Sequence, residues 1–70
     1  MNQSKDEVNL RRLSVKHREL EERLAVLAGR RFPTEPEQQE ESTLKKMKLK
    51  VKDEMESILV QRPELAGRHG

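Results

Sequence analysis

Five leucines and one histidine recur at alternating intervals of three and four between residues 10 and 27, and this spacing constrains the fold more than any other feature. The positions are Leu10, Leu13, His17, Leu20, Leu24 and Leu27. This alternation places all of them on one side of an α-helix, as the a and d positions of a coiled coil do. A helix with one apolar side needs a second helix against which to bury it. The pattern therefore predicts a pair of helices or a larger bundle.

A second apolar run, within residues 44–59, supplies the other helix. Its inward positions are Leu44, Met47, Val51, Met55 and Ile58. The four-residue steps on both sides of Val51 depart from a strict heptad, as a local stutter does. We call the inward positions of the two runs the seam.

Two capping boxes mark where the helices begin. Ser4 is followed three residues later by Glu7, and Thr34 is followed by Glu37. In this motif the Ser or Thr hydroxyl and the Glu carboxylate each bond a backbone N–H of the first helical turn. The helices are therefore predicted to begin at residues 5 and 35.

A glycine and a proline mark where the helices end. Gly29 suits the left-handed conformation that commonly follows a helix, and Pro63 disfavours a helical conformation in the residue before it. Residues 1–62 are then one hairpin. The predicted elements are helices over residues 5–28 and 35–61, a turn over residues 29–34, and a flexible C-terminal tail over residues 63–70.

The short turn between two helices of similar length predicts an all-α fold, an antiparallel two-helix hairpin with coiled-coil-like packing. A turn centred near Arg31 sets Leu44 beside Leu20 and Val51 beside Leu13. Blocks of opposite charge then face each other: Arg30 and Arg31 near Glu35 and Glu37, the Glu19, Glu21 and Glu22 block near Lys45 and Lys46, and Arg11 and Arg12 near Asp53 and Glu54.

One seam is a thin core for a chain of 70 residues without cysteine, and chains of this size commonly gain stability from oligomerisation. A second apolar stripe lies on the far sides of the helices. It contains Val8, Val15, Val26, Leu49 and Val60. We therefore expect self-association, most simply a homodimer that forms a four-helix bundle.

The stretch LKKMKLKVKDEM over residues 44–55 resembles the signature of the YdcH-like family of small bacterial proteins. The stretch VKHREL over residues 15–20 is similar to the first-helix element of that family. The resemblance extends over residues 15–59. It implies a short helical hairpin in the bacterial cytoplasm, and it implies no activity because the family is one of unknown function.

A cluster of lysines in the second helix is the first candidate site. Its members are Lys45, Lys46, Lys48, Lys50 and Lys52. Such a cluster could contact the phosphates of RNA or DNA. However, Phe32 in the turn is the one aromatic residue, so base stacking has little support. A solvated face, partly paired with glutamates of the first helix, is the favoured interpretation.

His17 is a polar residue among the leucines of the seam. The favoured interpretation is a partly buried residue that fixes the register of the helices. One alternative is a pH switch, because a buried imidazole loses its charge readily. Another is half of a metal site together with Glu21, although two ligands are too few for a stable site.

Several classes of function have no support in the sequence. No base and orienting group accompany the Ser and Thr hydroxyls, and no Gly-rich phosphate loop is present. Two helices also offer no deep concavity for a small substrate. We expect no catalysis, cofactor, metal or small-molecule substrate. The chain also has no run of about 20 apolar residues and no apolar signal core, so we expect a cytoplasmic protein without membrane contact.

These observations favour a helical interaction or scaffold protein. Its expected partners are a second copy of itself and another protein of unknown identity. A nucleic-acid-binding hairpin that uses the lysine cluster is the alternative, and a net charge of +2 does not demand it.

Overall fold

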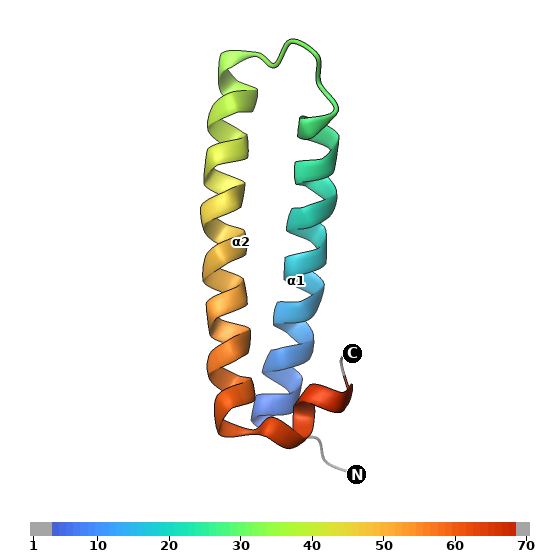
Figure 1. Cartoon of the computed structure of the whole chain (residues 1–70), viewed down its shortest axis with the longest axis vertical. Coiled ribbons are helices and arrows are strands. Elements are labelled where there is room, and N and C mark those ends of the chain that lie inside the picture. The colour runs from blue at the N-terminus through green and yellow to red at the C-terminus, as the bar shows by residue number, and fades with distance from the viewer. Residues whose placement is uncertain (1–3, 69–70) are drawn as a thin grey trace.

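The structure, a computed structural model that describes residues 4–68, consists of two long antiparallel helices lying side by side (Figure 1). Helix α1 spans Lys5–Ala28 and helix α2 spans Glu35–Gln61. A short 3₁₀ helix, η1, follows at Pro63–Arg68. No strand occurs within residues 4–68, so the described part of the chain is an all-α hairpin.

The start of each helix is held by its capping residue. At α1, the Ser4 hydroxyl accepts a hydrogen bond from the N–H of Glu7 at 3.1 Å. At α2, the Thr34 hydroxyl accepts from the N–H of Glu37 at 3.3 Å, and the Glu37 carboxylate accepts from the N–H of Thr34 at 2.9 Å. Each bond satisfies a backbone donor that would otherwise lack a partner in the first turn.

The end of α1 differs from the prediction. Gly29 has φ −79° and ψ −6°, which is a right-handed conformation, so the left-handed assignment is wrong. Its N–H lies 3.2 Å from the carbonyl oxygens of both Ala25 and Val26. Gly29 therefore continues the last turn of α1.

Helix α2 ends where Pro63 requires it to end. Arg62 has φ −130° and ψ 68°, outside the helical region, and its N–H still donates to the Ile58 carbonyl at 2.8 Å. Proline restricts the preceding residue in this way because the ring clashes with that residue in a helical conformation.

The core is a thin strip along the inner sides of the helices. The buried apolar residues are Leu10, Leu20 and Leu27 of α1, Val51 of α2 and Leu65 of η1. The other seam positions, Leu13, His17, Leu24, Leu44, Met55 and Ile58, are half-buried. Met47 is 37% exposed because it lies at the edge of the seam.

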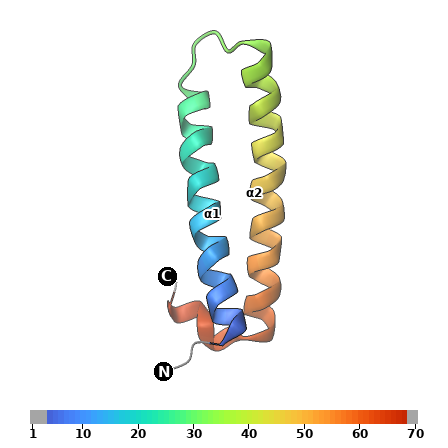
Figure 2. The same ribbon diagram turned by 180° about the vertical axis from the view of Figure 1, so that it is seen from behind.

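The segment predicted to be a flexible tail instead forms η1 through residue 68. Leu65 is only 2% exposed, and η1 lies across the open end of the hairpin beside the start of α1 (Figures 1 and 2). Arg62 contacts Asp6 at 3.5 Å and Glu64 at 2.6 Å, which links this end to α1. The open end of a two-helix hairpin leaves apolar surface uncovered, and Leu65 is the large apolar side chain available to cover it. Residues 69–70 lie outside the described residues.

One contact between the helices lies about a turn or more from the predicted register, whereas Arg23 pairs with Glu40 within one residue of it. Lys48 reaches Glu21 of α1, with Nζ 3.3 Å from Oε2, whereas Lys45 pairs with Glu41 of its own helix. In Figure 1 the connecting segment extends past the end of α1 before α2 begins.

One of the three predicted charge blocks forms its contact between the helices. Arg30 pairs with Glu37 at 3.1 Å, as the first block requires, and Glu21 finds Lys48 in place of Lys45 or Lys46. In the third block, no ion pair joins Arg11 or Arg12 to Asp53 or Glu54 in the described part of the chain. Arg12 and Glu54 do border the same shallow groove.

Candidate functional site

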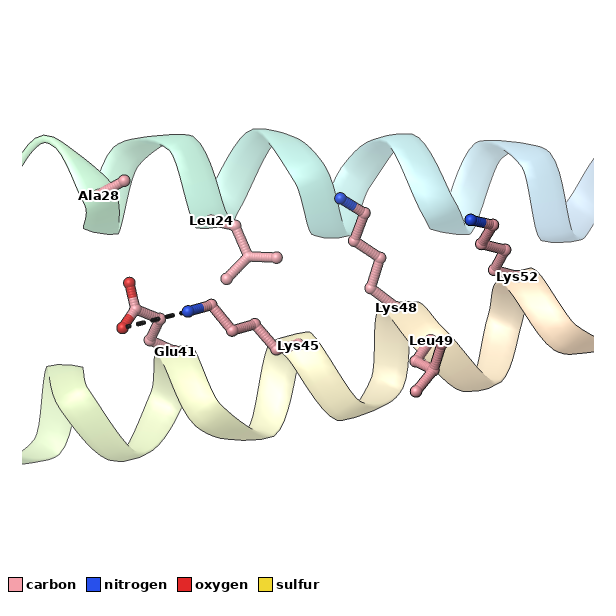
Figure 3. A pocket seen from close by; sticks show the side chains of 7 residues that line it. All are labelled: Leu24, Ala28, Glu41, Lys45, Lys48, Leu49 and Lys52. Atoms are coloured by element: carbon pink, nitrogen blue, oxygen red, sulfur yellow. Dashed lines mark ion pairs between the residues drawn. The ribbon is translucent and has the colours of Figure 1, made fainter.

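A shallow groove between the two helices brings apolar and basic side chains together (Figure 3). Its residues are Leu24, Ala28, Glu41, Lys45, Lys48, Leu49 and Lys52. Lys48 and Lys52 extend toward α1, whereas Leu49 points away from it. The groove is therefore an apolar strip bordered by ammonium groups, and Leu49 forms its outer edge.

The structure does not gather the five clustered lysines on one surface. Lys45, Lys48 and Lys52 line the groove, but Lys46 and Lys50 do not. Successive residues of an α-helix are about 100° apart, so Lys45, Lys48 and Lys52, spaced by three and four, share one side, whereas Lys46 and Lys50 lie on another. Lys45 and Lys48 also lie near the carboxylates of Glu41 and Glu21, at 3.9 and 3.3 Å.

His17 takes part in a polar chain that crosses the seam. Its Nδ1 lies 3.2 Å from Oε1 of Glu21, and Oε2 of the same carboxylate lies 3.3 Å from the Lys48 ammonium. The His17 side chain is 23% exposed. Glu21 thus joins a seam residue of α1 to a residue of α2. Within residues 4–68, no group of three or more His, Cys, Asp or Glu side chains is placed to hold a metal ion.

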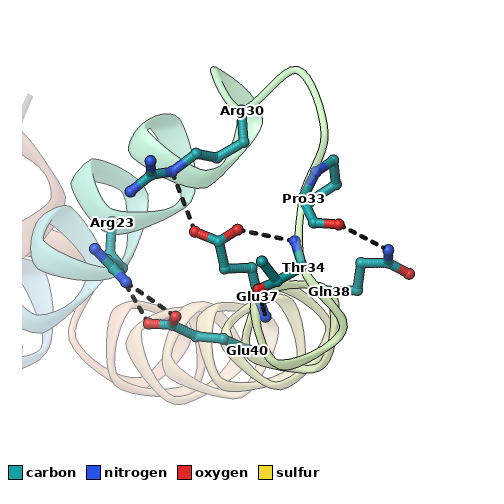
Figure 4. A network of polar contacts seen from close by, with 7 residues as sticks. All are labelled: Arg23, Arg30, Pro33, Thr34, Glu37, Gln38 and Glu40. Carbon is teal, nitrogen blue, oxygen red and sulfur yellow. Dashed lines mark hydrogen bonds and ion pairs between the residues drawn. The ribbon is translucent and has the colours of Figure 1, made fainter.

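A second polar network holds the start of α2 against the end of α1 (Figure 4). Arg23 donates two hydrogen bonds to Glu40, from Nε at 2.8 Å and from Nη2 at 3.0 Å. Such a two-point contact fixes the relative positions of the planar groups. Gln38 closes the turn by donating from Nε2 to the Pro33 carbonyl at 3.2 Å.

These contacts shift the titration of the groups involved. The N–H of Thr34 bonds the Glu37 carboxylate and lowers its pKa below the ordinary value of 4.5, and the Arg30 charge adds to the effect. Hydrogen bonding by Arg23 lowers the pKa of Glu40, and the same contact raises the pKa of Arg23. All of these groups are at the surface, so solvent screening keeps each contact weak.

The second apolar stripe is exposed but divided between two sides of the hairpin. Val15 and Val26 of α1 are 41% and 51% exposed, and Leu49 and Val60 of α2 are 60% and 80% exposed. Val8 is half-buried. Each set lies on the side of its helix turned away from the other helix, because the seam occupies the facing sides. One flat surface cannot cover both sets at once.

Two contacts were missed by the sequence reasoning. The burial of Leu65 had a local signal, a large apolar residue just after Pro63, but its partner surface exists only in the folded hairpin. The Arg23–Glu40 contact joins residues 17 positions apart. The predicted register sets Arg23 beside Glu41, so this signal was present in the sequence, but the charge blocks did not include Arg23 or Glu40.

Residues 4–68 contain no helix with an apolar stretch long enough to cross a membrane. No curated protein and no solved structure matches the chain significantly. The sequence does match, over residues 10–59, a family described as "Protein of unknown function (DUF465)". This range covers the seam of both helices and the lysine cluster, and it confirms the resemblance to YdcH-like proteins. The chain therefore belongs to the DUF465 family of small proteins of unknown function, which includes the YdcH-like proteins.

Proposed function

We propose that this protein is a non-enzymatic helical interaction module that associates with a second copy of itself and presents its charged exterior to another protein. The observation that supports this proposal is the apolar surface that the hairpin leaves uncovered. Leu49 and Val60 are 60% and 80% exposed, although a chain of this size has little apolar side-chain material to spare. Leu49 also borders the groove that contains Leu24 and Ala28, and contiguous exposed apolar surface commonly marks a protein interface.

The total exposed area supports the same proposal. A compact monomer of 8.2 kDa exposes about 4500 Å². This chain exposes 5580 Å², because its extents are 48 × 18 × 17 Å. The excess of about 1000 Å² is close to the roughly 800 Å² that each partner contributes to a standard interface.

Thermal unfolding at different protein concentrations tests this proposal. For an associating chain, dilution favours the unfolded state by mass action, and we expect Tm to fall by about 3–6 °C for each tenfold dilution. A double variant with Val15→Lys and Leu49→Glu should lose this dependence while it keeps its helical circular dichroism. As a control, Lys16→Glu with Gln61→Lys alters exposed polar residues and should retain the dependence. A Tm of the wild-type protein that does not change with dilution would contradict the proposal.

The alternative, a nucleic-acid-binding hairpin, has less support from the geometry. Its lysines lie on two sides of α2, and two of them already lie near carboxylates. Binding of a generic RNA and DNA at about 50 and 200 mM salt tests the alternative, because a protein that neutralises several phosphates loses orders of magnitude in affinity across this range. Tight, salt-sensitive binding would favour it, and no binding at the lower salt would exclude it.

A further inference from the structure

The charged residues on the outer face of α2 change from basic to acidic at Leu49. We define this face as Lys45, Lys46, Leu49, Asp53 and Glu56, all of which are exposed. Val51 is buried toward α1, and Leu49 stands about 200° around the helix from it. Leu49 accordingly points away from α1 in Figure 3. The basic residues come before Leu49 and the acidic residues come after it.

This order makes the outer face complementary to itself. From this order we infer that two copies of the chain dock through their α2 helices, antiparallel, about a two-fold axis at Leu49. The inference rests on the proposed self-association and names its interface. In an antiparallel pair centred on Leu49, a residue before Leu49 meets a residue at a similar distance after it in the partner.

The flanks of the helix decide which charges meet. Lys46 and Asp53 lie on one flank of Leu49, whereas Lys45 and Glu56 lie on the other, by the 100° step of the helix. Equivalent flanks adjoin in an antiparallel pair, so Lys46, three residues before Leu49, faces the second copy's Asp53, four residues after it. Lys45 and the second copy's Glu56 share the other flank, but they are offset by about 4.5 Å along the helix axis. The two-fold axis repeats each contact. Lys52 extends toward α1 and stays outside this contact.

The opposite orientation is disfavoured by the same residues. A parallel pair centred on Leu49 would place the lysines of one chain beside the lysines of the other. It would likewise place carboxylates beside carboxylates. Like charges in register repel, so the charge order selects the antiparallel pair. The apolar centre is small, since it contains the two Leu49 side chains and the stems of the lysines. The charges therefore set the orientation of a weak dimer.

Charge reversal at one contact tests the inference. Lys46→Glu alone, or Asp53→Lys alone, replaces both symmetry-related attractions with repulsions, and we expect the dissociation constant of the dimer to rise about tenfold or more. A mixture of the two variants should associate as tightly as the wild-type protein. In the mixed pair the introduced carboxylate meets the introduced ammonium at one contact, and the unchanged Lys46 and Asp53 meet at the other.

Sedimentation equilibrium of each variant and of the mixture measures this association. Lys50→Glu is the matched control: it makes the same change in charge on the same helix, and it should leave the dimer unchanged.

Disulfide trapping tests the position of the axis in a chain that has no cysteine of its own. Leu49→Cys should form a covalent dimer rapidly under mild oxidation, since a two-fold axis brings the two sulfurs within bonding reach. Val60→Cys is more exposed and lies on the same helix about 16 Å away, so its two copies are about 33 Å apart and should react slowly.

The outcomes separate this inference from the proposed function. A wild-type protein that is monomeric at every concentration contradicts both. A dimer that is unaffected by Lys46→Glu and by Asp53→Lys, or one in which Val60→Cys cross-links as fast as Leu49→Cys, overturns the α2 interface and leaves self-association intact. Selective association of the mixed variants supports the interface.

Discussion

Replacing Leu65 by Ala should destabilise the hairpin measurably, although this residue lies near the C-terminal end of the chain. Leu65 is 2% exposed, and full burial of a leucine side chain contributes about 1.5–3 kcal/mol. Removing the Leu65 side chain can lower the free energy of unfolding by no more than the docking of η1 contributes to it. Beyond that limit η1 simply detaches from the hairpin. We therefore expect a loss of about 1.5–3 kcal/mol in the free energy of unfolding, at the lower end of the range for a buried leucine.

Urea unfolding followed by circular dichroism at one protein concentration measures this loss. Val60→Ala is the control, since its side chain is 80% exposed and the change should stay within about 0.5 kcal/mol. Truncation after Arg62 should cost about as much as Leu65→Ala, because Leu65 is the buried residue among positions 63–66. A loss below about 0.5 kcal/mol for both Leu65→Ala and the truncation would refute the docking of η1.

Three further predictions concern the turn end of the hairpin. Gly29→Ala should raise the free energy of unfolding by about 0.4–1 kcal/mol, because Gly29 is right-handed and an added Cβ would meet the Val26 oxygen at an ordinary 3.5 Å; a loss in urea unfolding would show that the residue needs a left-handed conformation. Thr34→Ala should lower the free energy of unfolding by about 0.5–2 kcal/mol through loss of the cap, whereas Thr34→Ser should restore most of it; equal stability of all three proteins would contradict the observed capping box. Folding lowers the pKa of Glu37 and of Glu40, so their contribution to the free energy of unfolding is present above pH 4.5 and is lost as the pH falls through the lowered values. The Tm difference between the wild-type protein and a Glu37→Gln, Glu40→Gln variant should therefore shrink from pH 7 to pH 3. A constant difference would argue against these contacts.

Features determined by neighbouring residues were predictable from the sequence. The capping residues Ser4 and Thr34 and the proline at 63 gave helix bounds that coincide with those of α1 and α2. Their effect is local, since each acts on backbone groups within one turn. The spacing of the leucines likewise indicated the sides of the helices that face each other.

Features that depend on the path of the chain were not predictable in the same way. The register depends on how far residues 29–34 extend along the helix axis before α2 begins, and no local sequence pattern reports that distance. The docking of Leu65 requires a surface formed by residues distant in the sequence. The charge order of the outer face of α2 is present in the sequence, but it indicates an interface only because Leu49 points away from α1.

The absolute mass of the protein in solution, measured by light scattering over a dilution series, tests self-association most directly. A self-associating hairpin should show about twice the chain mass of 8.2 kDa at high concentration, falling toward 8.2 kDa on dilution. A mass of 8.2 kDa at every concentration would contradict it and would leave the exposed apolar residues of α1 and α2 to a different partner.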